Sequence, residues 1–187
     1  MKVRQNPGPS TGSRVNRCRR HCENARVDSA GDVVRVTEAS GADAVRQCAA
    51  IWARAKARRD GDPEPATVEE TVPGIERRLG LDGARLFLAR RDGGPVGFAV
   101  VAPRERNLEL FYLGVDPGAW GGGVGSRLLR EVADHARAIG AERLELWVID
   151  DNERAIRVYE RSGWVGTGKV ERDPASGRLE RRFLRHV

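Results

Sequence analysis

Apolar and polar positions along the chain follow two spacings, which predict short strands separated by helices. Apolar or β-branched runs predict strands at 33–37, 86–89, 96–101, 108–115, 144–149, 164–170 and 179–184. Apolar residues three and four positions apart predict helices at 42–59, after a loop at 60–70, at 125–139 and after residue 152. The resulting order, β-α-α-β-β-β-α-β-α-β-β, predicts an α/β (α+β) fold with a mixed sheet and helices on its faces.

Turn and cap residues mark several of these boundaries. Asp92-Gly93-Gly94 between two apolar runs is a strong hairpin signal. Gly140 suits the residue that follows a helix, and Gly163 ends the last helix in the same way. Asp151 and Asn152 offer caps for the start of that last helix. The turn and cap residues therefore agree with the order of strands and helices predicted from the apolar spacing.

The distribution of charge along the chain indicates where the folded domain begins and which classes of partner to expect. The chain has a net charge of +6, and the whole excess lies in residues 1–26, which hold seven basic side chains and one acidic one. The remaining residues balance, so no nucleic-acid partner is expected. Residues 1–30 also contain few large apolar side chains, which predicts a disordered basic tail there and a single domain at 31–187.

Cysteine usage and hydropathy predict a cytoplasmic protein. Cys18, Cys22 and Cys48 are an odd number without the spacing of a disulfide framework. Cys18, His21 and Cys22 would need a fourth ligand to form a structural zinc site, and none is suitably spaced, so no metal is predicted. No apolar run is long enough to span a membrane, and the first thirty residues lack the apolar core of a secretory signal.

A glycine cluster joins an apolar run to the third predicted helix. Gly121, Gly122, Gly123 and Gly125 lack a Cβ atom, so their backbone N–H groups can approach a ligand closely. The loop presents these groups at the positive end of a helix dipole, which favours a phosphate. It lacks the Gly-Lys-Ser/Thr ending of a P-loop, and a dinucleotide-binding loop would follow the first strand of the fold. A glycine-rich turn without a ligand is the alternative.

Two motifs follow one another along the chain. The first is the run 110–117 with Trp120-Gly121-Gly122-Gly123-Val124-Gly125, and the second is Asn152-Glu153-Arg154-Ala155 with Tyr159-Glu160-Arg161-Ser162-Gly163-Trp164. Together they resemble the GNAT superfamily of acetyl-CoA-dependent N-acetyltransferases, from about residue 33 to the end. The glycine loop is similar to the family's Arg/Gln-x-x-Gly-x-Gly/Ala loop for coenzyme A. It departs from that pattern with Trp120 where Arg or Gln is usual, and with Gly122 where a basic residue is common.

The resemblance implies the GNAT acyl-CoA N-acyltransferase fold, with acetyl-CoA as co-substrate and no metal. The backbone of Leu113, Gly114 and Val115 would pair with the pantetheine arm, which a splayed or bulged strand would expose. The pyrophosphate would lie on the N–H groups from Gly121 through Ser126. This stretch includes Gly122, Gly123, Val124 and Gly125, and the assignment adds Trp120 and Asn152 as cofactor-binding residues.

The resemblance also implies two catalytic residues. Tyr159 matches the family's tyrosine and is the candidate general acid, with a core tyrosine that packs its helix on the sheet as the alternative. Glu109 is the candidate general base, on the same strand face as Leu113, where partial burial would raise its pKa. The alternative for Glu109 is a structural salt bridge, for instance to Arg85 or Arg106.

These assignments predict an N-acetyltransferase that moves the acetyl group from acetyl-CoA to a primary amine of a small molecule or a protein, by direct attack. The alternative is a GNAT-fold protein that binds acyl-CoA or a partner without turnover. Five carboxylates at 60–70 would form an acidic rim that favours a cationic amine. The other expectations are a monomer or homodimer, with no membrane partner.

Overall fold

The structure, a computed structural model, describes residues 33–174 and 176–187 of the chain. Within these residues the elements follow the predicted order, with one added 3₁₀ turn, η1 (Pro117–Ala119), before the third helix. The helices are α1 (Ala42–Asp60), α2 (Val68–Leu79), α3 (Val124–Ala138) and α4 (Glu153–Arg161). The strands are β1 (Arg35–Ala39), β2 (Arg85–Arg91), β3 (Gly94–Arg104), β4 (Asn107–Val115), β5 (Arg143–Ile149), β6 (Val165–Arg172) and β7 (Leu179–His186).

Turn residues lie where the sequence predicted them. Asp92 and Gly93 adopt positive φ angles of 50° and 80° in the tight connection between β2 and β3. Gly140 and Gly163, with φ angles of 72° and 81°, follow the ends of α3 and α4. Glycine tolerates this left-handed conformation freely and aspartate does so more often than most residues, so local sequence sets each of these turns.

Two boundaries differ from the prediction. α2 begins at Val68, inside the stretch expected to be a loop, because Thr67 and Glu70 form a capping box. The Glu70 N–H donates to the Thr67 hydroxyl at 3.2 Å, and the Thr67 N–H donates to the Glu70 carboxylate at 2.8 Å. β1 begins two residues after the start of the predicted run, and Val33 is 75% exposed.

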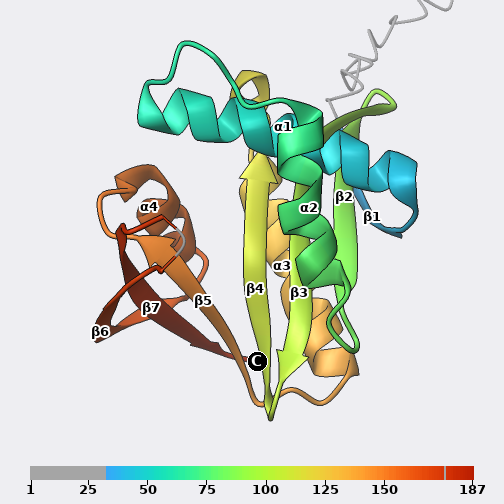
Figure 1. Ribbon diagram of the computed structural model, residues 1–187. Coiled ribbons are helices and arrows are strands. Elements are labelled where there is room, and N and C mark those ends of the chain that lie inside the picture. The colour runs from blue at the N-terminus through green and yellow to red at the C-terminus, as the bar shows by residue number, and fades with distance from the viewer. Residues whose placement is uncertain (1–32, 175) are drawn as a thin grey trace, which may run out of the picture. The chain divides into compact units, whose positions relative to one another are not determined.

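The described strands form one mixed sheet in the order β1-β2-β3-β4-β5-β7-β6, and its middle is split. Neighbouring strands are antiparallel except for β4 and β5. The parallel pairing of β4 with β5 covers only Asn107–Leu110 against Arg143–Leu146. Beyond these residues the two strands diverge and form the V seen in Figure 1. The remainder of β4 therefore pairs with β3 on one side and with none of the described strands on the other.

Helices cover both faces of the sheet and bury a group of apolar side chains on each. The group under α3 and α4 includes Leu128, Leu146 and Tyr159. The group under α1 and α2 includes Ile51 and Ile75. Figure 1 shows α1 and α2 in front of the sheet and α3 behind it. The group of apolar side chains that a residue of β4 or β5 contacts therefore identifies the face of the sheet on which its side chain lies.

Some expectations fall on the first part of the chain. The predicted basic tail at 1–30, and with it Cys18, His21 and Cys22, lies outside the described residues. In the described part of the chain no helix is long and apolar enough to cross a membrane. Cys48 is buried in α1, where burial raises the pKa of its thiol to about 12 and leaves it unreactive at neutral pH.

Candidate functional site

A β-bulge lies in β4 just where that strand leaves β5. Val101 of β3 pairs with Leu110 of β4. The next pair is Val100 with Tyr112, so Phe111 is an extra residue on β4. An extra residue shifts the alternation of side chains by one position. Odd-numbered residues before the bulge and odd-numbered residues after it therefore point to opposite faces of the sheet.

The bulge makes one sequence prediction wrong. Strict alternation placed Glu109 and Leu113 on the same face of the strand. In the structure Leu113 packs against the group under α3, whereas Tyr112 packs with the group under α1 and α2. Glu109 lies in the electrostatic field of Arg78, which belongs to α2. Glu109 and Leu113 therefore occupy opposite faces of the sheet.

The edge of β4 that faces the split carries unused backbone groups. The Asp116 N–H donates to the Val96 carbonyl of β3 at 2.9 Å, and successive strand residues point their backbone groups to alternate sides. Leu113 and Val115 therefore point theirs into the split. The Val115 carbonyl accepts a hydrogen bond from the Trp120 indole N–H at 2.8 Å. The N–H and carbonyl of Leu113 are thus the groups most open to an extended ligand along β4.

Gly114 differs from its two neighbours. By the same alternation its backbone groups point toward β3, where Phe98 is its register partner. A Cβ atom added to Gly114 would lie 2.3 Å from a carbon of the Phe98 ring, so the glycine makes room for this ring. Of the three residues to which the resemblance assigned pantetheine contacts, Leu113 and Val115 therefore have backbone groups on the open edge of β4, and Gly114 does not.

The loop after β4 presents an uncapped helix N-terminus. Gly121 and Gly123 have φ angles of 83° and 75°, in the region that favours glycine. Gly123 is the N-cap of α3, and no side chain caps this helix. The N–H groups of Val124, Gly125 and Ser126 belong to the first turn, which an α-helix cannot satisfy internally. With the helix dipole, these donors form an environment for an anion.

One loop N–H assigned to the ligand is used within the loop. The Gly122 N–H donates to the Ala119 carbonyl at 3.3 Å. A Cβ atom added to Gly125 would lie 3.6 Å from Val158 of α4, so the start of α3 lies against α4. The structure thus brings together the free edge of β4, the loop and α4, as the two sequence motifs implied.

Three arginines from other elements surround the loop, and the sequence analysis gave none of them a role. Arg54 of α1 donates two hydrogen bonds, of 2.8 and 2.7 Å, to the carboxylate that precedes η1. Arg154 in the first turn of α4 lies over the Trp120 ring, with its Cζ 4.5 Å from the ring centroid. Arg91 at the end of β2 places Nη2 3.5 Å from the Gly122 carbonyl oxygen. Only Arg154 belongs to a motif that could have pointed to it.

Glu109 is a buried carboxylate with an arginine partner. Its side chain is 11% exposed and accepts a hydrogen bond from Arg104 Nε at 2.8 Å. A salt bridge therefore exists, but with Arg104 rather than with Arg85 or Arg106. Burial raises the pKa of Glu109 although Arg104 lowers it, and the nearby carboxylate of Glu145 raises it further. A carboxylate in this environment is a stronger base than an exposed one.

Glu145 was not predicted as a site residue, and it lies beside Glu109 in the β4–β5 register. Its side chain is 12% exposed and accepts hydrogen bonds from Arg182 at 2.6 Å and from Asn107 at 3.2 Å. A buried and a half-buried carboxylate, each with its own arginine, therefore lie at the closed end of the split.

Tyr159 lies in the core at the last turn of α4. It is 7% exposed, and its ring centroid lies 5.9 Å from that of Trp164 and 6.4 Å from that of Phe183. Burial raises the pKa of Tyr159 well above the usual value of a phenol. Within the described residues its hydroxyl has no hydrogen-bond partner, so it stays protonated and free to donate. This packing fits the core alternative, and the protonated hydroxyl fits a general acid, so the catalytic role stays a prediction.

Asn152 is the N-cap of α4. Its Oδ1 accepts a hydrogen bond from the Ala155 N–H at 3.3 Å. This contact explains the residue structurally. A contact with a cofactor, as the resemblance implied, would use the amide nitrogen or the second lone pair of Oδ1.

Two of the five carboxylates in the acidic rim expected after α1 are paired with arginines. Asp60 accepts hydrogen bonds from Arg59 and Arg178, which lower the pKa of its carboxyl to about 2. Glu69 pairs with Arg46 at 2.8 Å. Carboxylates that are paired within the fold attract a cationic ligand weakly, so the support for a cationic acceptor rests on Asp62, Glu64 and Glu70.

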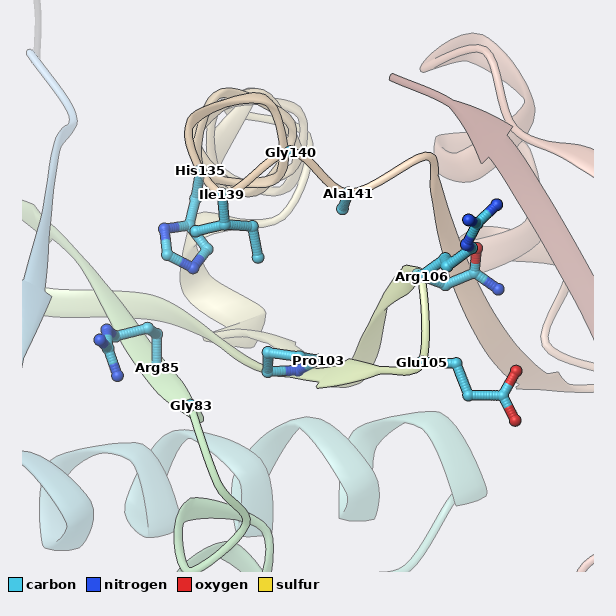
Figure 2. Close-up of a pocket in the computed structure, with 10 residues that line it drawn as sticks. Gly83, Arg85, Pro103, Glu105, Arg106, His135, Ile139, Gly140 and Ala141 are labelled. Atoms are coloured by element: carbon cyan, nitrogen blue, oxygen red, sulfur yellow. The ribbon is translucent and has the colours of Figure 1, made fainter.

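A hollow of about 260 Å³ lies at the other end of α3 from the glycine loop. Figure 2 shows His135 and Ile139 projecting from the end of α3 toward Pro103, with Arg85 and Arg106 on either side. Because α3 has 15 residues, the hollow is separated from the loop by roughly 22 Å. Burial and the nearby guanidinium of Arg85 lower the pKa of His135. No predicted site residue lines this hollow.

Comparison with known proteins identifies the family of the chain. The sequence model of the acetyltransferase (GNAT) family matches residues 48–164. The chain belongs to this family. The match spans β4, the glycine loop and α4, and so includes every predicted site residue. The prediction of membership in the GNAT superfamily, a group of acyltransferases, is confirmed.

Individual relatives agree with the family match. Mycothiol acetyltransferase of Streptomyces avermitilis is 44% identical over 87 residues, which are 46% of this chain and 28% of that protein. The ribosomal-protein-S18-alanine N-acetyltransferase of Escherichia coli superposes with a TM-score of 0.66 at 19% identity, over 83% of this chain and 94% of that one. PaiA N-acetyltransferase of Thermoplasma acidophilum, solved in complex with coenzyme A, superposes with a TM-score of 0.64 at 15% identity, over 83% and 99%. The two structures confirm the predicted GNAT fold, and the chain matches less than a third of the length of the curated relative.

Replacing Gly123 with valine is expected to weaken the affinity of this GNAT domain for acetyl-CoA by about tenfold or more. Gly123 has a φ angle of 75° with nothing within 4 Å of an added Cβ atom, so the strain falls on the backbone that presents the N–H groups. Calorimetric titration measures the loss. Gly140→Val is the matched control, since Gly140 has a φ angle of 72° and equally open surroundings at the far end of α3. Equal affinity in both variants would contradict a role of the loop in binding.

Proposed function

We propose that residues 31–187 form a single N-acetyltransferase domain that transfers the acetyl group of acetyl-CoA to a primary amine of a small molecule or a protein. The observation that carries this proposal is the combination of a free strand edge with an uncapped helix N-terminus directly after it. An acyl-CoA needs both, because its pantetheine arm contains amides and its pyrophosphate is an anion. A glycine-rich turn without a ligand would require neither.

The residues of the site suit acetyl-CoA. The open N–H and carbonyl of Leu113 would pair with the pantetheine amides, and the backbone of Val115 would continue that edge. The N–H groups of the first turn of α3 would hold the pyrophosphate, together with those of Gly121 and Gly123. An N–H group at the edge of β4 could also stabilise negative charge on the thioester oxygen. Acetyl-CoA supplies the activated acetyl group.

Glu109 and Tyr159 would move the two protons that the transfer requires. The attacking amine must be neutral, and Glu109 would accept its proton directly or through a water molecule. As the nitrogen–carbon bond forms and the carbon–sulfur bond breaks, the departing thiolate would take the proton of the Tyr159 hydroxyl. Exchange with solvent would then restore the carboxylate and the phenol.

The names of the relatives suggest the first acceptors to test. The matched curated relatives are named for mycothiol, and the E. coli neighbour is named for the alanine of a ribosomal protein. The desacetyl form of mycothiol and a peptide with an N-terminal alanine are therefore the two opening members of an amine panel. A panel of this kind separates a small-molecule acceptor from a protein acceptor.

Calorimetric titration with acetyl-CoA, alongside CoA, NAD and ATP, tests the donor site before any acceptor is known. Micromolar affinity for the CoA species alone supports the proposal, and acetylated amines are then sought by mass spectrometry. Binding without any acetylated product across the panel would favour the alternative of an acyl-CoA-binding protein without turnover. The buried packing of Tyr159 is the observation that keeps this alternative in view. Absence of CoA binding would refute both.

A further inference from the structure

The glycine loop carries no positive charge of its own. From Asp116 to Ser126 the sequence contains a single charged side chain, that of Asp116. Arg54 neutralises this carboxylate through two hydrogen bonds of 2.8 and 2.7 Å. A pyrophosphate at the start of α3 would therefore meet backbone N–H groups from this stretch, and any guanidinium or ammonium groups must come from residues outside it. Charged donors form shorter and stronger hydrogen bonds to phosphate than neutral ones.

Arg154 lies at the loop on an aromatic support. Its guanidinium carbon is 4.5 Å from the centroid of the Trp120 ring, within the range of a cation–π interaction. Trp120 is itself held by the 2.8 Å hydrogen bond from its indole N–H to the Val115 carbonyl. Arg154 is exposed and forms no ion pair within the part of the chain that the structure describes. Stacking occupies the face of a guanidinium and leaves its N–H groups free for a ligand.

Arg91 occupies the space beside the loop that a side chain at position 122 would need. A Cβ atom added to Gly122 would lie 2.7 Å from Arg91 Nη2. The same nitrogen lies 3.5 Å from the Gly122 carbonyl oxygen. The guanidinium of Arg91, at the end of β2, thus lies beside Gly122 of the loop.

We propose that Arg91 and Arg154 bind the pyrophosphate of the acyl-CoA donor, and that Trp120 positions Arg154 for this contact. The proposal rests on the proposed function of the donor site. It gives a physical reason for both departures of the loop from the family pattern. A side chain at position 122 would displace the Arg91 guanidinium from its place beside the loop, and the indole at position 120 supports Arg154. Guanidinium groups match phosphate oxygens in pairs, so each arginine adds directed hydrogen bonds to the N–H donors of α3.

Calorimetric titration of Arg91→Gln and Arg154→Gln with CoA and with dephospho-CoA tests the proposal. Glutamine keeps polarity and removes the charge. Each variant is expected to weaken the affinity for both ligands by about tenfold, since both ligands contain the pyrophosphate. The dependence of affinity on salt should also become shallower. Arg137→Gln is the matched control, because Arg137 is an exposed arginine in the last turn of α3 whose partner is Asp134.

The outcomes separate the proposal from the function on which it rests. Wild-type affinity in both variants would overturn the role of the arginines while leaving the donor site intact. A loss seen with CoA but not with dephospho-CoA would overturn the pyrophosphate assignment, because the contact would then be with the 3′-phosphate. Absence of CoA binding by the wild-type protein would overturn the donor site itself.

A double-mutant cycle tests the positioning role of Trp120. Trp120→Leu removes both the ring under Arg154 and the hydrogen bond to Val115. If Trp120 acts through Arg154, the double variant Trp120→Leu/Arg154→Gln should have about the same affinity for CoA as the single variant with the lower affinity. Additive losses would overturn this role and indicate that Trp120 contributes independently. Thermal unfolding of each variant shows whether a loss reflects damage to the fold.

Discussion

Replacing Glu109 with glutamine is expected to lower kcat/KM for acetyl transfer at neutral pH by about 100-fold or more, the usual loss for a general base. Glutamine keeps the shape of the side chain and can still accept the hydrogen bond from Arg104, so the fold and CoA affinity should survive. In the wild-type protein, activity should fall as the pH drops through the pKa of Glu109, which burial holds above the usual value of a glutamate. Initial rates across pH measure this acidic limb, and the variant should lack it.

Two neighbouring substitutions show whether that limb belongs to Glu109. Arg104→Gln removes the cation that lowers the pKa of Glu109, so the limb should move to higher pH. Glu145→Gln removes the carboxylate that raises this pKa, so the limb should move to lower pH. Arg78 also lowers it from α2 and serves as a weaker third probe. A limb that stays in place in both variants would assign it to another group and leave Glu109 with its salt bridge alone.

The fold could be predicted from the sequence because its signals are local. The turn at Asp92-Gly93 needs only residues that tolerate a positive φ, and the N-cap at Asn152 needs only a short polar side chain before a helical pattern. Each such signal acts over a few residues, and together they define the order of strands and helices. The glycine loop is local in the same sense, so its place at the start of α3 was also predictable.

The side-chain faces of β4 could not be predicted, because the bulge depends on pairing with another strand. Phe111 has no feature that marks it as an extra residue, and its effect is to move Leu113 to the face opposite Glu109. The partner of Glu109 follows from register in the same way. Ala102 lies opposite Glu109, and Arg104 is two residues further on the same face of β3, within reach as a diagonal neighbour. Spacing along the chain alone pointed to other arginines.

The two predicted catalytic groups lie on opposite faces of the sheet. Glu109 faces α2, whereas Tyr159 belongs to the apolar group under α3 and α4. A continuous sheet would separate them. Beyond the last β4–β5 pair the two strands diverge, and no backbone of the described strands lies between the two faces there. In the proposed reaction the amine would therefore approach from the face of Glu109, and the departing thiolate would lie toward Tyr159. In this proposal the split would serve the reaction as well as expose the edge of β4.

Replacing Tyr159 with phenylalanine is expected to lower kcat by about 100-fold with little change in the affinity for acetyl-CoA. Phenylalanine keeps the packing of the ring on Trp164 and Phe183 and removes only the hydroxyl. Within the described residues this hydroxyl has no hydrogen-bond partner, so its removal breaks no hydrogen bond of the fold and should leave the thermal midpoint close to that of the wild-type protein. Single-turnover rates, CoA titration and thermal unfolding together separate a role in catalysis from a role in packing.

Tyr112→Phe is the matched control, because the chain contains two tyrosines and burial raises the pKa of both. The Tyr112 ring packs edge-on against Trp52, with centroids 5.0 Å apart, on the face of the sheet away from Tyr159. We expect its kcat to stay close to that of the wild-type protein. If kcat falls in Tyr112→Phe instead, the general acid would be Tyr112, on the face of the sheet from which the amine approaches in the proposed reaction. If neither variant slows turnover, solvent must protonate the thiolate, and Tyr159 is then a core residue that holds α4 on the sheet.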